Sequence, residues 1–320
     1  MSDYAIEAIN LTKKFGDFIA VNDLVFTVKQ GEIFGFLGAN GAGKSTTIRM
    51  MCGLLQSTSG TAVVGGYDIN TQTEELKLNI GYMSQKFSLY DDLTVEQNVR
   101  FFGGVYGLRN AQLKERMDWV LKMADLKGRE DSLTRNLSGG WKQRLALGCA
   151  ILHKPKIVFL DEPTGGVDPI SRRNFWELIN QLSSEGITVL VTTHLLDEAE
   201  YCNDIILINA GKLIASGSPV ELKTTHIKSP ILEVALTQSS IVEALELIRV
   251  RPWALETSVF GTKLHVMVDD EAEGKRLIRK ALREKDIEIQ HIERIVPSLE
   301  DVFLYLLEQD QKTLQGVGYA

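Results

Sequence analysis

Positions 38–46 of the chain read Gly38-Ala39-Asn40-Gly41-Ala42-Gly43-Lys44-Ser45-Thr46, which fits the phosphate-binding pattern G-x-x-x-x-G-K-[ST]. Glycines in this pattern permit a tight turn with positive φ, so that successive backbone N–H groups can converge on one anion. The Lys44 ammonium can reach the β- and γ-phosphates of a nucleotide, and the Ser45 hydroxyl can bind Mg²⁺. All nine residues are therefore predicted to contact a bound nucleotide.

The flanking segments have the patterns of the strand and the helix that this loop requires. Residues 32–37 predict a buried strand before it, and residues 46–55 predict a helix after it. The helix is expected to start near Gly43, where the positive end of its dipole would face the phosphates. Its predicted apolar face consists of Ile48, Met51, Leu54 and Leu55.

Composition is that of a globular protein large enough for two cores. The 320 residues are 44% hydrophobic and 24% charged, with a formal net charge of −7. This acidic balance argues against nucleic acid as a partner, because nucleic-acid-binding surfaces are basic. No window approaches the length of a membrane-spanning apolar helix. Cys52, Cys149 and Cys202 lie in apolar or helical surroundings, which predicts reduced core residues in a cytoplasmic protein.

Residues 4–222 alternate short apolar runs with helical patterns, which predicts an α/β fold. The continuous apolar runs 157–160 and 188–191 are typical of buried parallel strands. Residues 112–124 have the spacing of a helix with one apolar face. Residues 205–215 predict a hairpin.

A second domain is predicted after the polar, turn-forming segment 217–230. Its elements follow the order βαββαβ, which indicates a small α+β unit of the ferredoxin-like type. The expected strands span 231–236, 255–260, 263–268 and 286–294, and the expected helices span 239–249 and 270–284. The predicted organisation is residues 1–222, residues 230–310 and a poorly ordered tail, 311–320.

A last helix is expected to open at Ser298, which suits an N-cap, with Glu300 and Asp301 at the positive end of the dipole. Its apolar stripe consists of Leu299, Val302, Phe303, Leu306 and Leu307. Two interpretations stay open: the stripe packs on its own domain, or it forms a dimer contact.

Two carboxylates, Asp161 and Glu162, directly follow the apolar run 157–160. A carboxylate at the end of a buried strand beside the phosphate loop can orient Mg²⁺ or its waters, and this role is predicted for Asp161. Glu162 can face the γ-phosphate and polarise an attacking water as general base. Adjacent carboxylates at a strand end are otherwise usually solvated, but the buried run and the upstream loop argue against that alternative.

A third motif precedes the carboxylates and reads Leu137-Ser138-Gly139-Gly140-Trp141-Lys142-Gln143-Arg144. Together with the loop and Asp161-Glu162, it resembles the signature of ATP-binding-cassette (ABC) ATPases. The resemblance covers about residues 4–222 and implies a P-loop NTPase cassette with a helical subdomain that carries the signature. It also implies ATP and Mg²⁺ as ligands. Ser138, Gly139 and Gly140 would then close over ATP held by the other protomer, which is a second copy or a homologous cassette.

The resemblance implies roles for four further positions. Gln85 matches the glutamine that touches the Mg²⁺ or its water shell, near the docking place of a permease subunit. His194 matches the switch histidine at the γ-phosphate, and Phe15 matches the aromatic residue that stacks on adenine. Asp168, in the loop 164–168, matches the aspartate that crosses the dimer interface. The implied catalytic residues are Lys44, Gln85, Glu162 and His194, and the implied metal-binding residues are Ser45, Gln85 and Asp161.

Three positions depart from the family pattern. Trp141 stands where Gln is usual, Gly165-Gly166 where Ser-Gly or Ala-Gly is usual, and Phe15 where Tyr is commoner. None of these changes removes a phosphate or metal ligand. We therefore expect altered contacts at the edge of the site and not a loss of hydrolysis.

The C-terminal part resembles the ATPase subunits of ABC-2-type exporters, through a small domain that ends in the run 297–303, Pro-Ser-Leu-Glu-Asp-Val-Phe. The run 86–94 looks most like the multidrug branch. The resemblance implies an ATPase that powers export, bound peripherally at the cytoplasmic face of a membrane to membrane-embedded permease subunits. Two alternatives stay open: an importer ATPase of the same fold, and a soluble ABC ATPase outside transport.

Overall fold

A computed structural model describes residues 3–86, 88–237 and 240–316, the last six of them without their side chains. The chain divides into two compact units, Met1–Pro219 and Val220–Ala320. Each unit has hydrophobic cores of its own, and each is considered by itself. Across the described residues, no helix combines the length and the apolar character needed to cross a membrane.

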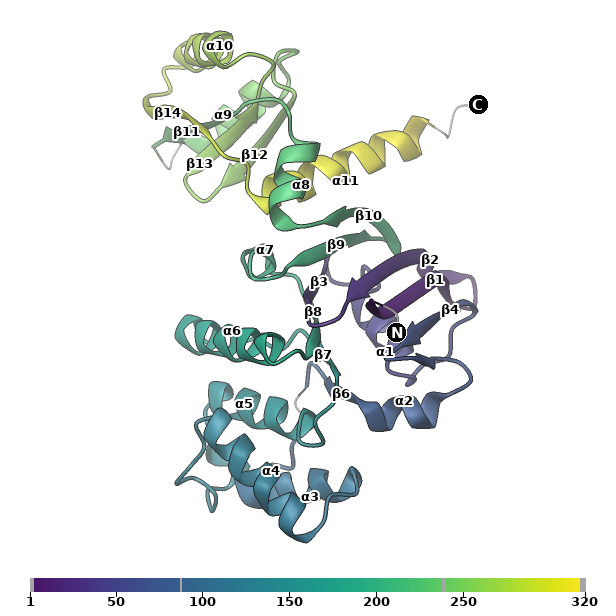
Figure 1. Cartoon of the computed structure of the whole chain (residues 1–320). Coiled ribbons are helices and arrows are strands. Elements are labelled where there is room, and N and C mark those ends of the chain that lie inside the picture. The colour runs from purple at the N-terminus through teal and green to yellow at the C-terminus, as the bar shows by residue number, and fades with distance from the viewer. Residues whose placement is uncertain (1–2, 87, 238–239, 317–320) are drawn as a thin grey trace. The chain divides into compact units, whose positions relative to one another are not determined.

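A six-stranded sheet with the order β10-β9-β3-β8-β7-β6 forms the centre of the first unit (Figure 1). β3 (Ile33–Leu37), β7 (Ile157–Asp161) and β8 (Thr188–Thr193) are buried along their whole length, as their continuous apolar runs predict. β6 (Ile80–Met83) and β9 (Asp204–Asn209) lie on either side, and these five strands run parallel. Their carboxyl ends therefore meet at one edge of the sheet.

The predicted hairpin closes one side of this sheet. β10 (Lys212–Gly217) returns antiparallel to β9. Ala210 and Gly211 form the turn with φ angles of 46° and 77°, which is the left-handed conformation that tight hairpin turns require.

An antiparallel sheet with the order β2-β1-β4-β5 lies against the central sheet. Its strands are β1 (Tyr4–Phe15), β2 (Phe18–Lys29), β4 (Ser59–Val64) and β5 (Tyr67–Asp68). Phe26 of β2 packs edge-on against Phe36 of β3, with ring centroids 5.1 Å apart. Such contacts join the two sheets into one core.

The helix after the phosphate loop, α1, spans Lys44–Met51 and is shorter than predicted. Gly53 adopts a φ of 65° just after it, and this left-handed residue ends the helix. Ile48 and Met51 are buried as expected, but the side chain of Leu54 is 48% exposed. Leu54 and Leu55 lie beyond the last residue of α1, so the prediction that they belong to the apolar face of this helix is wrong. A second short helix, α2, spans Thr73–Asn79.

Three helices pack side by side at the β6 end of the sheet (Figure 1). They are α3 (Val95–Val105), α4 (Asn110–Met123) and α5 (Gly139–Ala150). Thr94 and Gln97 form a capping box that fixes the start of α3. A separate apolar cluster holds the three helices together, which confirms the predicted helical subdomain.

Two more helices of the first unit connect strands of the central sheet. α6 (Pro169–Ser184) joins β7 to β8, and α7 (Leu196–Ala199) follows β8. Phe175 and Trp176 of α6 are buried, and they anchor the helix to the unit.

The second unit has a four-stranded antiparallel sheet with the order β12-β13-β11-β14. Its strands are β11 (Ile231–Leu236), β12 (Glu256–Phe260), β13 (Lys263–Met267) and β14 (Ile289–Ile295). In chain order they lie at places three, one, two and four of this sheet, which is the ferredoxin-like arrangement. The predicted βαββαβ unit is therefore confirmed.

Helices α9 (Ile241–Arg249) and α10 (Glu271–Arg283) pack their apolar faces on this sheet. The first predicted residue of α9, 239, lies outside the described residues. α8 (Pro219–His226) and α11 (Leu299–Gly316) complete the unit. The tail 311–320 was predicted to be poorly ordered; residues 311–316 are helical, and residues 317–320 lie outside the described chain.

The start of α11 is fixed by a buried pair. Asp301 accepts hydrogen bonds from the backbone N–H and the hydroxyl of Ser298, each at 2.7 Å. The same carboxylate accepts from Nδ1 of His265, on β13, at 2.7 Å. These bonds hold the pKa of Asp301 below its ordinary value, against the opposing effect of burial. Leu299 and Val302, at the start of the apolar stripe, are buried.

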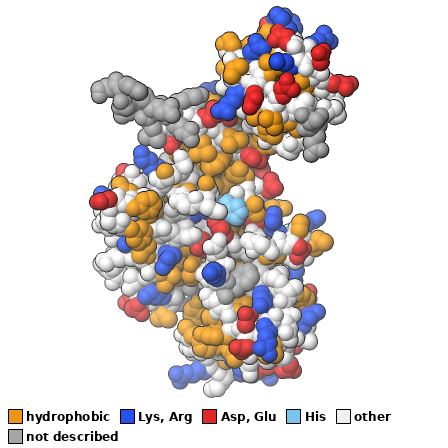
Figure 2. Space-filling view, turned by 180° about the vertical axis from the view of Figure 1, so that it is seen from behind, with side chains coloured by type: hydrophobic (Ala, Val, Ile, Leu, Met, Phe, Trp, Pro, Cys, Tyr) orange, Lys and Arg blue, Asp and Glu red, His pale blue; other side chains and the backbone are white. Residues whose placement is uncertain are grey.

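Charged side chains of both signs are interspersed on the visible face of the second unit (Figure 2). On α10, Lys275 pairs with Glu271 at 2.7 Å and Arg276 pairs with Glu273 at 2.5 Å. Such exposed pairs one turn apart stabilise a helix only slightly.

Candidate active site

The phosphate loop links the carboxyl end of β3 to the start of α1, and Lys44, Ser45 and Thr46 form the first turn of that helix. Two of its glycines are required by close backbone approach. A Cβ atom at Gly38 would lie 2.3 Å from the carbonyl oxygen of Ile208, and one at Gly43 would lie 2.4 Å from that of Ala20. Gly43 also has a φ of 105°. The loop is thus a cradle that only glycine permits, at a helix start that favours anions.

Lys44 lies inside this cradle and is almost fully buried. Its Nζ donates to the carbonyl oxygens of Gly38 at 2.8 Å and Ala39 at 3.1 Å. The same Nζ lies 3.4 Å from Oε1 of Glu162. A buried ammonium therefore lies within the loop that is predicted to hold the phosphates of a nucleotide.

Ser45 and Asp161 meet through a direct hydrogen bond. The Ser45 hydroxyl donates to Oδ1 of Asp161 at 2.9 Å, and the Thr192 hydroxyl donates to the same oxygen at 2.7 Å. The donor set at this point consists of hydroxyl and carboxylate oxygens, which are the ligands that Mg²⁺ prefers. These side chains therefore fit the predicted metal position.

Glu162 is the centre of the predicted catalytic group. Its Oε2 accepts a hydrogen bond from Nε2 of Gln85 at 3.0 Å and lies 3.4 Å from Nδ1 of His194. With Lys44 near Oε1, three predicted catalytic side chains surround one carboxylate that is 9% exposed. The structure thus brings together Lys44, Gln85, Glu162 and His194 from four separate segments.

The backbone of Glu162 is held in an uncommon conformation. Its φ is 47°, which for a residue other than glycine costs of the order of 1 kcal/mol or more. The N–H of Glu162 donates to the hydroxyl of Thr192 at 2.9 Å, and this bond helps to maintain the turn. Such strain is common where a side chain must be aimed at a functional site.

Phe15 lies at the end of β1, paired with Phe18 across the tip of the β1–β2 hairpin. Both rings are exposed, by 51% and 64%, and Nζ of Lys13 lies 5.2 Å from the centroid of Phe15. The exposed face of Phe15 is available for stacking on a base. Phe18 offers a second such ring, which the sequence pattern did not single out.

The signature residues Ser138, Gly139 and Gly140 lie at the start of α5, within the helical subdomain. Ser138 occupies the N-cap position, but its side chain makes no capping hydrogen bond. A Cβ atom at Gly140 would lie 2.5 Å from Oγ of Ser171, so close packing on α6 requires glycine there. Trp141 stacks beneath the guanidinium of Arg129, which lies 4.2 Å from the ring centroid.

The predicted interface residue Asp168 caps α6 in this structure. Its Oδ1 accepts from the backbone N–H groups of Ile170 at 3.1 Å and Ser171 at 3.0 Å. Hydrogen bonding, with the Ser171 side chain as the largest contributor, lowers the pKa of Asp168 below its ordinary value. The aspartate is therefore ionised at neutral pH.

Sequence reasoning missed two buried residues that position the site. Thr192 binds both Asp161 and the backbone of Glu162. Gln143 of α5 is fully buried and donates from Nε2 to the carbonyl oxygen of Pro163 at 2.7 Å, which ties the signature helix to the segment after Glu162. No local signal marks Thr192, because its role depends on its place opposite Asp161 in the register of β7 and β8.

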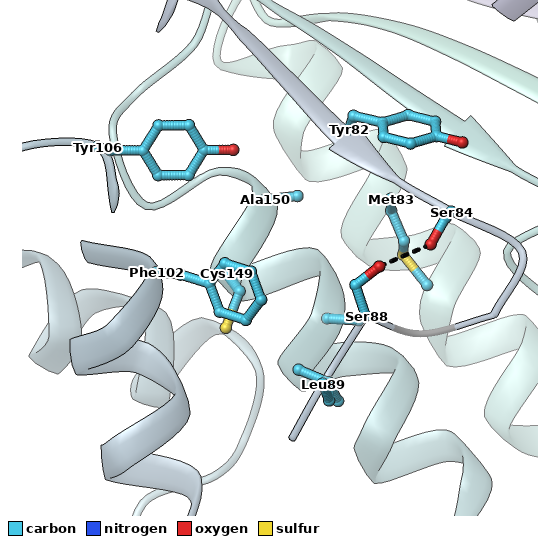
Figure 3. A pocket seen from close by; sticks show the side chains of 10 residues that line it. Tyr82, Met83, Ser84, Ser88, Leu89, Phe102, Tyr106, Cys149 and Ala150 are labelled. Carbon is cyan, nitrogen blue, oxygen red and sulfur yellow. Dashed lines mark hydrogen bonds between the residues drawn. The ribbon is translucent and has the colours of Figure 1, made fainter. Parts of the chain in front are cut away.

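A small cavity of about 40 Å³ lies between β6, the segment with Ser84 and Ser88, and helices α3 and α5 (Figure 3). Tyr82, Phe102 and Tyr106 line it with their rings. The hydroxyls of Ser84 and Ser88 are hydrogen-bonded at 3.0 Å on one side of it. Burial raises the pKa of Tyr82 to about 12.

Comparison with known proteins gives two matching family models. Residues 21–165 match the family described as ABC transporter. Residues 217–306 match the family described as ATP-binding protein DrrA1-3-like, C-terminal domain. Together they cover parts of both structural units.

Two relatives and one solved structure extend this match. The probable multidrug ABC transporter ATP-binding protein YbhF of Escherichia coli is 54% identical over 237 residues, which are 73% of this chain and 41% of YbhF. This chain thus spans about two fifths of the length of YbhF. The linearmycin resistance ATP-binding protein LnrL of Bacillus subtilis is 37% identical over 94% of this chain and 97% of its own length.

A solved dimeric ATP-binding cassette, in a post-hydrolysis state with ADP and Pi, has a TM-score of 0.61 at 28% identity. The match covers 67% of this chain and 98% of that one. With the loop, the carboxylates and the signature helix in the positions described above, these matches identify the family. The chain belongs to the ATP-binding proteins of the ABC transporter family.

Proposed function

We propose that this protein is the ATP-hydrolysing subunit of a membrane export transporter. The observation that best supports this proposal is that Lys44, Gln85 and His194 all approach the single carboxylate of Glu162, beside the phosphate loop. A general base needs this placement next to the γ-phosphate. The names of YbhF and LnrL, which refer to multidrug transport and to linearmycin resistance, support export.

ATP would bind with its phosphates in the loop 38–46 and its adenine on Phe15. Ser45 and Asp161 would hold Mg²⁺, with Gln85 at its water shell, and the ion would neutralise charge on the phosphates. Lys44 would stabilise the negative charge that develops on the transferring phosphoryl group. Glu162 would take a proton from the attacking water, while His194 contacts the γ-phosphate.

A complete site would need a second cassette. Ser138, Gly139 and Gly140 begin a helix on the helical subdomain, and a helix start with exposed N–H groups binds anions. In the proposed dimer these residues cover the ATP that the other copy holds. The dimeric cassette with ADP and Pi, which resembles this chain, supports such an arrangement.

The proposed membrane partner would dock beside Gln85, at residues 85–93 and the cavity of Figure 3. Phe101, on α3 nearby, is 43% exposed, and Tyr90 packs edge-on against it with ring centroids 4.7 Å apart. ATP can shift the conformational equilibrium only if the closed dimer binds it more tightly than the open state does. Closure would then move this surface and the subunits docked on it.

Substitution of Glu162 by Gln tests this function directly. The Glu162→Gln protein should bind ATP, lose at least about 100-fold in turnover because the base is absent, and accumulate as an ATP-bound dimer. Phosphate release and light scattering after size exclusion would measure both effects. The exposed Glu177→Gln variant, on α6, is the matched control and should keep wild-type turnover.

Undiminished turnover in Glu162→Gln would exclude the base assignment. Export is tested separately, by purification from native membranes and identification of the proteins that copurify. Recovery of membrane-embedded subunits supports the transporter function, and recovery of ribosomes without any membrane protein contradicts it.

A further inference from the structure

One buried carboxylate near the site has no part in the mechanism above. Glu198, on the short helix α7, is 1% exposed. A charge taken out of water is costly unless hydrogen bonds or opposite charges compensate it. The groups that bind Glu198 therefore show which segments of the chain this carboxylate holds together.

Each oxygen of this carboxylate accepts one threonine hydroxyl. The hydroxyl of Thr164 donates to Oε1 at 2.5 Å, and the hydroxyl of Thr193 donates to Oε2 at 2.7 Å. Nε of Arg172, on α6, lies 3.5 Å from Oε1 and contributes a partly exposed positive charge. Both threonines are buried to 2% exposure, so water competes little for these bonds.

The two threonines come from two different parts of the site. Thr164 follows the general base Glu162 by two residues and opens the loop 164–168. Thr193 ends β8 and directly precedes His194. The hydroxyl of Thr193 also accepts from the backbone N–H of Leu195 at 2.9 Å, so it fixes the backbone on both sides of His194. One carboxylate thus ties the loop 164–168 to the switch histidine.

We propose that Glu198 is a positioning residue that couples the loop 164–168 to His194. When a second cassette meets this loop, any displacement of Thr164 shifts the carboxylate that also holds Thr193, and His194 moves with it. His194 lies 3.4 Å from Glu162, so its position bears directly on the catalytic group. This inference rests on the proposed function, in which the loop lies at the dimer interface.

A purely structural role for Glu198 makes different predictions. If the network only held α7 in place, loss of either threonine hydroxyl would lower stability and leave kcat unchanged. If Glu198 couples the two segments, each loss lowers kcat at unchanged ATP affinity. The second loss then adds little, because both act through one carboxylate.

The test is a double-mutant cycle of Thr164→Val and Thr193→Val in the full chain. Valine keeps the shape of threonine and removes only the hydroxyl. We expect each single variant to lower kcat about tenfold or more with KM for ATP within about twofold, because each loses a hydrogen bond to a buried charge. The kcat of the double variant should be about the same as that of the slower single variant. Thr164→Ser and Thr193→Ser, which restore a hydroxyl, should recover most of the activity.

Thr188→Val is the matched control. Thr188 lies at the opposite end of the same strand, is also 2% exposed, and accepts a bond from the N–H of Gly31. Its substitution should leave kcat unchanged.

Two results would overturn the coupling. In the first, the loss of kcat in the double variant equals the product of the two single losses. In the second, the single variants keep wild-type kcat. If Thr188→Val and wild type hydrolyse ATP and Glu162→Gln does not, the proposed ATPase activity stands whatever the cycle shows. A wild-type protein without ATPase activity would refute both proposals.

Discussion

Glu162 is aimed by its neighbours and not by its own conformational preference. The backbone of Glu162 has a left-handed φ, which is unfavourable for a residue other than glycine. The hydrogen bond from its N–H to the Thr192 hydroxyl compensates part of that cost. The same hydroxyl donates to Asp161. One threonine therefore orients both carboxylates of the site, and its loss should be felt at both.

Thr192→Val should lower ATP turnover by about 10- to 100-fold without unfolding the protein. The variant removes one of the two hydroxyl groups that donate to Oδ1 of Asp161, and the loss of a hydrogen bond to a charged group costs about 1.5–3 kcal/mol. The N–H of Glu162 keeps the carbonyl oxygen of Thr192 as an acceptor at 3.2 Å. The half-saturating Mg²⁺ concentration should rise as well, because Asp161 is the proposed metal ligand. Initial rates over a Mg²⁺ titration measure both, and Thr192→Ser serves as the control that retains a hydroxyl.

The residue-scale predictions from sequence succeeded where a motif is contiguous. Residues 38–46 form the loop because glycine spacing and the following helix are local properties. Thr192 was missed because its role depends on strand pairing, which sets Asp161 opposite Thr192 in the parallel register of β7 and β8. A single sequence does not reveal which strands are neighbours.

At the scale of elements, helix ends were harder to predict than helices. α1 stops at Met51, because the left-handed Gly53 reverses the chain before Leu54 and Leu55 can extend the apolar face. Apolar spacing alone cannot detect this stop, since the two leucines continue the helical period. The buried strands were predicted closely, because a continuous apolar run with polar ends marks a central parallel strand.

The junction between α5 and β7 contains a half-buried histidine. Nε2 of His153 donates to the carbonyl oxygen of Ile80 at 3.0 Å, and its ring stacks on Tyr106 with centroids 3.7 Å apart. Nδ1 finds no hydrogen-bond partner among the described residues. Burial lowers the pKa of His153 to about 4, since a second proton would be placed on a nitrogen without an acceptor.

This pKa predicts a loss of stability in mild acid. The unfolded chain binds the proton near the ordinary pKa of 6.5 and the folded chain only near 4, so the unfolded state binds more protons between these values. The free energy of unfolding should therefore fall as the pH drops from about 6.5 to about 4, with a contribution of the order of 2 kcal/mol from this residue. Above pH 7 the contribution is fully present.

Urea unfolding of wild type and His153→Phe at pH 7 and pH 5 measures this contribution. Phenylalanine keeps the stacking on Tyr106 and cannot titrate, so the variant should lose less stability between the two pH values. His291→Phe is the control, because His291 is exposed and its ring forms only a surface pair with Glu293. Equal pH dependence in wild type and His153→Phe would contradict the assignment.

At the scale of the molecule, the order of elements identified the second unit, but not the pairing of its strands. The order βαββαβ is readable because each strand and helix has its own periodicity. That β11 lies between β13 and β14 follows only from contacts between residues far apart in sequence. The known rules for connecting strands and helices allow few strand arrangements for the order βαββαβ, and they led to the ferredoxin-like prediction.

Because the two units share no core, two unfolding transitions are predicted. The core of the second unit includes Ile278 and Val266, both fully buried, and none of its residues belongs to the cores of the first unit. A domain with its own core can unfold without its neighbour. ATP should bind only to the first unit, and at about 100 times its Kd it should stabilise that unit by about 2.7 kcal/mol. For a unit of this size, the upper limit of the expected rise in Tm is about 10 °C.

Scanning calorimetry of the Glu162→Gln chain, which retains ATP, tests this prediction. Mg-ATP should raise one transition and leave the other in place. Ile278→Ala should do the reverse and lower the second transition by about 10 °C or more, because a buried Ile→Ala change costs about 2–5 kcal/mol in a unit of roughly 100 residues. Val242→Ala, at a site on α9 that is 69% exposed, is the matched control and should shift neither transition appreciably. A single transition that moves with both ATP and Ile278→Ala would mean that the two units unfold as one.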